Sequence, residues 1–113
     1  MPARASKAKG RRLQNLLRDK LRTAMPGLEE DDIQSQTMGM TGEDIVLSPA
    51  ARKKIPYSFE CKNQEKLNIW SALEQTEKNC PEDRTPVLVF TRNHAPTYAV
   101  VPLEHFIERN LKS

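Results

Sequence analysis

The hydrophobic residues of this chain follow helical spacing in three stretches and strand-like spacing in five others. The first helical stretch carries apolar residues three or four positions apart, at Leu13, Leu16, Leu17, Leu21 and Ala24. This spacing forms one apolar stripe and predicts an amphipathic helix, which Met25-Pro26-Gly27 ends. Two short segments follow, residues 33–37 and 44–48, and their apolar or alternating pattern predicts strands.

A longer strand and a second helix are predicted in the middle of the chain. Residues 57–62 follow a proline and are rich in aromatic and small side chains, which is typical of a strand. Residues 64–79 then carry large apolar side chains at helical spacing, at Leu67, Ile69, Trp70 and Leu73. We expect this helix to bury Trp70 in the core. Ser48-Pro49, before the longer strand, predicts a capped helical turn.

The remaining elements decide the fold class. Residues 86–90 are continuously apolar, which is typical of a central strand covered on both faces. Residues 97–101 predict a last strand, and Pro102 starts a final helix. The predicted class is α/β of the α+β type, a mixed central β-sheet flanked by helices. Helix 64–79 is then the crossover between two parallel strands, and we expect strands 44–48 and 57–62 to form a hairpin.

Length and composition indicate one domain that does not cross a membrane. The chain has 113 residues, of which 37% are hydrophobic and 29% charged, enough for one modest core. No apolar run approaches the roughly 20 residues that cross a bilayer, so we expect a cytoplasmic protein. Cys61 and Cys80 lack the paired spacing of a zinc site, and we expect both to be reduced thiols.

Positive charge is concentrated at the N-terminus. The net charge is +3, but residues 1–26 hold eight Lys or Arg and one Asp, giving +7 and leaving −4 for residues 27–113. Such a segment binds nucleic acid by neutralising phosphates, although a solubilising tail is the alternative. We expect residues 1–10 to be a disordered basic arm and residues 11–113 to be the folded domain. The candidate DNA-binding residues are Lys7, Lys9, Arg11, Arg12 and Arg18, with Arg52, Lys53 and Lys54 on the turn before the longer strand.

Three charged residues form the candidate active site. Side chains alternate along a strand, so Glu60 and Lys62 share one face of strand 57–62. Asp44 starts the preceding strand and would approach Glu60 across the expected hairpin. Two neighbouring carboxylates repel each other unless a cation lies between them, and Mg²⁺ prefers oxygen ligands of this kind. Lys62 could then stabilise a phosphate or orient an attacking water.

Gly42-Glu43-Asp44, followed after a gap by Glu60-Cys61-Lys62, resembles the signature of PD-(D/E)xK nucleases, with Glu43 at the position of the family's proline. The resemblance covers residues 13–106 and implies a restriction-endonuclease-like core. It implies Asp44, Glu60 and the Cys61 carbonyl as ligands of Mg²⁺, with Mn²⁺ as a substitute, Lys62 as base or charge stabiliser, and Gln75 as an orienting residue. Whether Gln14 or Asp19 of the first helix completes the site, and whether it holds one or two metals, stays open.

The size and element order resemble Holliday junction resolvases of the Hjc type in particular. That resemblance implies an endonuclease for four-way or other branched DNA, and paired cuts require a homodimer because one chain offers one site. The terminal helix, with Phe106, Ile107 and Leu111, and the strand Tyr98–Val101 are candidate interfaces. One alternative is a nicking or restriction-like nuclease of linear duplex. The other is a non-catalytic nucleic-acid-binding protein in which the three charged residues form a structural ion pair.

Overall fold

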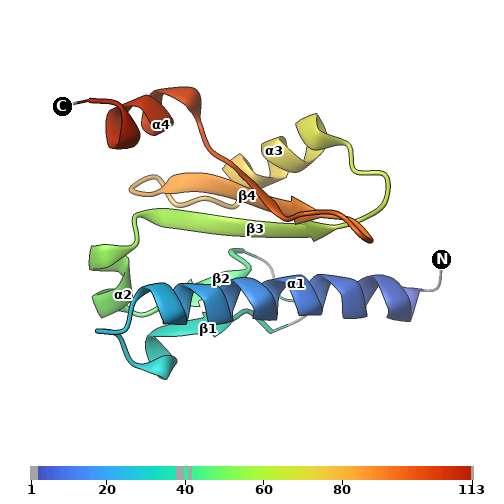
Figure 1. Ribbon diagram of the computed structural model, residues 1–113, viewed down its shortest axis with the longest axis horizontal. Helices are drawn as coiled ribbons and strands as arrows, with labels where there is room; N and C mark the ends of the chain where they lie inside the picture. The colour runs from blue at the N-terminus through green and yellow to red at the C-terminus, as the bar shows by residue number, and fades with distance from the viewer. Residues whose placement is uncertain (1–2, 38–39, 41, 113) are drawn as a thin grey trace.

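The computed structural model describes residues 3–37, 40 and 42–112, which form a mixed α+β domain (Figure 1). The elements, in chain order, are α1 (Ala3–Ala24), the 3-10 turn η1 (Glu30–Asp32), β1 (Ile33–Ser35), β2 (Ile45–Leu47), α2 (Pro49–Lys54), β3 (Tyr57–Asn63), α3 (Ile69–Lys78), β4 (Thr85–Thr91), β5 (Tyr98–Val100) and α4 (Leu103–Asn110). Helices flank a three-stranded mixed sheet. The predicted fold class is confirmed, and the arrangement is consistent with a restriction-endonuclease-like core.

The main sheet has the order β3-β4-β5. β3 and β4 are parallel and are connected by α3, which confirms the predicted crossover. β5 is antiparallel to β4, so β4 is the central strand, as its continuous apolar run predicted. Val87, Leu88 and Val89 are all buried because helices cover both faces of this strand.

The expected hairpin between strands 44–48 and 57–62 is wrong. β2 pairs with β1 in a separate antiparallel ladder, because the connection after β2 folds into α2. Ser48 caps α2 by accepting the Ala51 N–H, and Pro49 occupies its first turn, as predicted. Asp44, the residue before β2, still reaches the free edge of β3, where its N–H donates to the Phe59 carbonyl at 3.0 Å.

The two faces of the sheet bury different material. Phe59 and Cys61 point toward α1 and join the main core with residues of α1, β1, β2, α2 and β4. Ser58 and Glu60 point to the opposite face, which α3 covers with Ala72 and Thr76. Trp70 of α3 does not enter either core: it is 81% exposed, which corrects the expectation of a buried tryptophan. The small residues Ala72 and Thr76 are the ones that approach the sheet.

The N-terminal segment is helical rather than disordered. Residues 1–2 lie outside the described residues, but α1 begins at Ala3 and runs without interruption through the expected arm. Ala, Lys and Arg have good helix propensity, and Lys9 anchors this part of α1 by an ion pair with Glu65. Among the described residues, no helix combines the length and the apolar character needed to cross a membrane.

Candidate active site

Asp44 is fixed against the free edge of β3 by two hydrogen bonds. Its backbone N–H donates to the Phe59 carbonyl, and its Oδ2 accepts the backbone N–H of Cys61 at 2.7 Å. A backbone donor bound to a carboxylate orients it without neutralising it. Asp44 thus reaches the strand that carries Glu60 and Lys62, although the ladder expected to bring it there is absent.

Glu60 lies at the centre of β3, and its side chain is held by α3. The residue is 5% exposed, and its Oε1 accepts a hydrogen bond of 3.4 Å from Nδ2 of Asn79, the C-cap of α3. Its other oxygen, Oε2, is buried and accepts no hydrogen bond from the described residues. A buried carboxylate oxygen without a donor is costly, so this atom marks a place where a proton or a cation would be stabilised.

Burial raises the proton affinity of both carboxylates, and the charge of Asp44 raises that of Glu60 further. Burial first, and then the charge of Asp44, raise the pKa of Glu60 to about 7. Burial also raises the pKa of Asp44, against the opposing effect of the Cys61 N–H and of the Lys62 charge. Lys62 is half-buried on the same face of β3 as Glu60. Among the described residues it forms no ion pair, so its ammonium group is available to another anion.

Gln14 of α1 is the first-helix residue that joins the site. It is buried and lowers the pKa of the Asp44 carboxyl, and its Oε1 has no hydrogen-bond partner among the described residues. Asp19, the other candidate, is exposed and bound to Arg18. The unpartnered oxygens of Glu60 and Gln14, together with Asp44, are hard donors suited to a divalent cation. No group of three or more His, Cys, Asp or Glu side chains suited to a metal occurs in the described ranges, so the side-chain donors here are two carboxylates and one amide.

Glu43 precedes Asp44 but has a different environment. Its carboxylate pairs with Arg52 at 3.3 Å and with Arg84 at 3.8 Å. The Arg84 guanidinium is almost fully buried and also donates to the carbonyls of Ile55 and Tyr57. Two arginines therefore neutralise Glu43, whereas Asp44 faces a second carboxylate. The structure gives Glu43 a bracing role between α2 and the start of β4.

The α3 residue that reaches Glu60 is Asn79 and not Gln75, the residue that the resemblance implied. Gln75 is exposed on α3 and lines a shallow surface hollow with Ser71 and Lys78. Asn79, four residues later, is the α3 residue that contacts Glu60. Sequence reasoning missed Asn79, although a polar residue just before Cys80-Pro81 is a signal for a helix end that can direct its side chain inward.

The basic residues expected to bind DNA separate into free and paired groups. Lys9 is only 8% exposed, and its Nζ is 3.2 Å from Glu65 Oε2, so its charge is already neutralised. Arg18 is bonded to Asp19 and Asn15, and Arg52 to Glu43. The exposed members of the set that form no ion pair with the described residues are Lys7, Arg11, Arg12, Lys53 and Lys54. Burial also raises the pKa of the Cys61 thiol, so this residue is a core thiol and not a nucleophile.

One comparison with known proteins identifies the family of this chain. Residues 5–113 match the model of the family described as "Phage putative PDDEXK endonuclease". No match was found among the curated proteins or among the solved structures. The matched span includes Asp44, Glu60 and Lys62, the residues that carry the resemblance to PD-(D/E)xK nucleases. The chain therefore belongs to this phage PDDEXK endonuclease family and to the PD-(D/E)xK nuclease superfamily.

Proposed function

We propose that this nuclease is a Mg²⁺-dependent, structure-selective endonuclease that cuts branched DNA, and most specifically that it is a Holliday junction resolvase. The observation that carries the proposal is the meeting of Asp44, Glu60 and Gln14 beside Lys62. In that group two buried oxygens have no partner, and Lys62 has no ion pair among the described residues. Unsatisfied acceptors beside an unpaired cation suit a metal ion and a phosphate better than they suit a structural role.

Asp44 and Glu60 would hold Mg²⁺, with the Cys61 carbonyl as a third donor. The N–H and C=O of one strand residue point to the same side, and the Cys61 N–H points to Asp44, so its carbonyl lies on the same edge of β3. Bound Mg²⁺ would supply charge stabilisation to the phosphate and a lowered pKa to a bound water. Gln14 would orient Asp44 and offer its free Oε1 to that water.

Lys62 would act on the phosphate and on the attacking water. Its ammonium lies one pleat beyond Glu60 and would stabilise negative charge on a phosphate oxygen as the P–O bond to the leaving strand breaks. As the alternative role, Lys62 would serve as the catalytic base for the attacking water. Asn79 would hold Glu60 in one rotamer through Oε1 and leave Oε2 for the ligand.

The exposed basic residues of α1 would guide the DNA backbone to this site. Lys7, Arg11 and Gln14 recur at three- and four-residue spacing and therefore share one side of the helix. Because Gln14 contacts Asp44, Lys7 and Arg11 continue the line from the carboxylates toward the N-terminal end of α1. Lys53 and Lys54 of α2 are exposed on another part of the surface and would bind phosphates further along the substrate.

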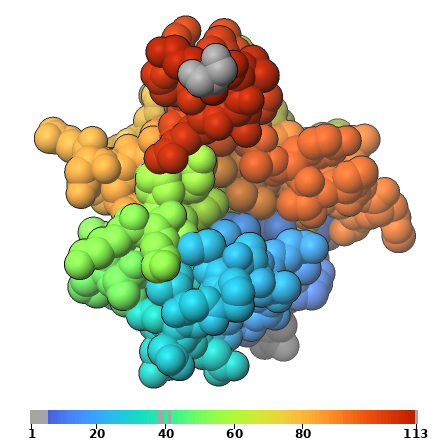
Figure 2. Space-filling model, turned by 60° about the vertical axis from the view of Figure 1, so that its left-hand side comes forward, coloured from blue at the N-terminus to red at the C-terminus, as the bar shows by residue number. Residues whose placement is uncertain are grey.

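Paired cuts in a four-way junction would require two copies of the chain. α4 stands out at one end of the molecule (Figure 2) and has no buried residue. Its Leu103, Phe106 and Leu111 are exposed, and an apolar surface of this kind is typical of an interface. We propose that a second copy covers α4 in a two-fold dimer.

Cleavage of a labelled four-way junction and of its component duplexes, with and without Mg²⁺, tests the proposal. We expect paired incisions in the junction, only in the presence of Mg²⁺ or Mn²⁺, by a protein that sediments as a dimer at micromolar concentration. Preferential cutting of linear duplex would replace the resolvase by a nicking or restriction-like nuclease. DNA binding without cleavage under any metal condition would favour a non-catalytic protein.

A further inference from the structure

A cavity lies on the face of the sheet that carries Glu60 and Lys62, and Phe90, the register partner of Lys62, lines it. Lys62 is the register partner of Phe90 in β4, and Phe90 is the register partner of Tyr98 in β5. These three residues form one row across the sheet, with side chains on the same face. Strands are about 4.8 Å apart, so the Cα atom of Tyr98 is about 10 Å from that of Lys62. This distance corresponds to about three base steps of a DNA strand at 3.4 Å each.

The cavity combines aromatic faces with polar groups. Its volume is about 410 Å³, and Phe90, Tyr98, Leu67, Ile69, Gln64 and Arg92 contribute to its lining. The rings of Phe90 and Tyr98 are stacked at 6.0 Å with an interplanar angle of 29°, and Tyr98 is 57% exposed. Planar apolar surface beside an amide and a guanidinium is suited to a nucleobase with its attached phosphate.

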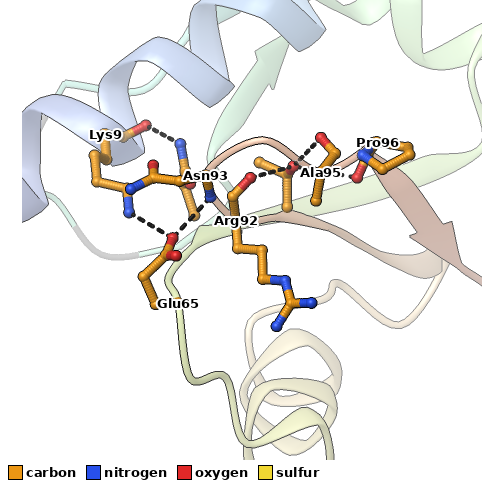
Figure 3. Close-up of polar contacts among 8 residues, drawn as sticks. Lys9, Glu65, Arg92, Asn93, Ala95 and Pro96 are labelled. Carbon is orange, nitrogen blue, oxygen red and sulfur yellow. Dashed lines mark hydrogen bonds and ion pairs between the residues drawn. The ribbon is translucent and has the colours of Figure 1, made fainter.

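One wall of the cavity is the β4–β5 turn, and internal contacts hold that turn in place (Figure 3). Glu65 Oε2 accepts the Asn93 N–H at 2.7 Å and the ammonium of Lys9 at 3.2 Å, which ties the turn to α1. Thr91 Oγ1 lies 3.2 Å from the carbonyls of both Ala95 and Pro96 and closes the turn on itself. The Arg92 side chain points away from this cluster toward the side of α3.

We propose that this cavity binds one unpaired nucleobase of the substrate strand, about three nucleotides from the phosphate that is cut. The inference rests on the proposed function and deepens it, because it names the feature of branched DNA that the enzyme would recognise. The faces of a paired base are covered by its neighbours in the stack, whereas an unpaired base can stack on an aromatic side chain. Arg92 at the rim would bind the phosphate of that nucleotide.

Substitution of Tyr98 separates this role from general DNA binding. The ratio of the affinity for a junction or fork with unpaired bases to the affinity for plain duplex should fall about 5- to 100-fold in Tyr98→Ala. Tyr98→Phe keeps the ring and should keep the ratio. Val46→Ala, an exposed apolar residue on β2, serves as the remote control. Binding is measured in EDTA, so that cleavage does not interfere.

Two further measurements identify the bound group. A 2-aminopurine at the unpaired position should lose fluorescence on binding to the unaltered protein and to Tyr98→Phe, but not to Tyr98→Ala. Arg92→Gln should reduce the salt slope for single-stranded DNA by about 0.7, the value for one phosphate contact. Equal losses on duplex and branched DNA, or a monomer in place of a dimer in Tyr98→Ala, would overturn the base pocket. If the unaltered protein binds and cuts DNA but Tyr98→Ala keeps the same ratio of branched to duplex affinity, the base pocket alone is overturned. If the unaltered protein binds no DNA, the proposed function is overturned.

Discussion

Two polar clusters on this domain contain the same kinds of residues but differ in burial and in pairing, because Glu65 is exposed whereas Glu60 is buried. In the cluster around Lys9, the ammonium pairs with Glu65, and Glu65 also accepts the Asn93 N–H. In the cluster around Asp44 and Glu60, the carboxylates face each other and two buried oxygens lack partners. A paired charge stabilises the fold, while a buried carboxylate without a cation can bind a ligand.

Their pKa values record the same difference. The Asn93 N–H and the Lys9 ammonium lower the pKa of Glu65, whereas burial and the neighbouring Asp44 raise that of Glu60 to about 7. Lys62 lies on the same face of β3 as Glu60, but of these two glutamates it is Glu65 that forms an ion pair with a lysine, Lys9. Burial and the position of the partner, and not the residue types, distinguish the two clusters.

The largest expected effect comes from removing charge at the unsatisfied cluster. Asp44→Asn and Glu60→Gln each keep the side-chain volume and remove a ligand charge, so the cleavage rate should fall on the order of 10³-fold or more. DNA affinity should stay equal or rise, because repulsion of the phosphate decreases. Single-turnover cleavage and filter binding measure the two quantities. The exposed Asp83→Asn and Glu82→Gln are matched controls, and parallel loss of folding in the site variants would instead indicate a structural cluster.

Lys62 should affect the rate more than it affects metal binding. Lys62→Ala should lower turnover by about 10²-fold, the usual contribution of a group that transfers a proton or stabilises charge. Lys62→Arg should not restore the rate, because a guanidinium does not give up its proton readily and has a different shape. Rates as a function of Mg²⁺ concentration separate turnover from metal affinity. Near-normal turnover of Lys62→Ala would remove this residue from the mechanism.

The metal-free protein should lose stability as the pH rises. The folded-state pKa of Glu60, about 7, is above its ordinary value of 4.5, so the folded state binds more protons between these values. Unfolding free energy should therefore fall by about 1–3 kcal/mol from pH 4.5 to pH 8 in EDTA. Glu60→Gln should flatten this dependence and Glu82→Gln should not, as measured by denaturant midpoints. Mg²⁺ at pH 8 should restore stability by binding the charged form.

The smallest expected effect contrasts two lysines of α1. Lys7 is exposed and in line with Arg11 and Gln14, whereas Lys9 is paired with Glu65. Lys7→Gln should lower the magnitude of the salt slope of duplex binding by about 0.9, while Lys9→Gln should leave the slope unchanged and reduce the unfolding free energy instead. An equal change of the salt slope in both variants would show that the Lys9–Glu65 ion pair breaks when the protein binds DNA.

The pattern of apolar and polar residues along the sequence determined the strands of the main sheet and the direction of their side chains. Strand alternation in 57–62 places Phe59 and Cys61 in the core with Glu60 and Lys62 opposite, and the apolar run 86–90 forms the central strand. The resemblance carried by Asp44, Glu60 and Lys62 agrees with the family match. These features depend on residues close together in the sequence, whose side-chain directions follow from the local backbone.

Tertiary structure decided the features that depend on distant partners. Lys9 is structural only because Glu65, far along the chain, meets its ammonium. Gln14 joins the site because α1 crosses β3 near Asp44, and Asn79 joins it because α3 ends above Glu60. Trp70 stays exposed because the narrower side of α3, with Ala72 and Thr76, fits the sheet more closely. Composition and periodicity specify which face of an element is apolar, but packing alone selects the neighbour that each face meets.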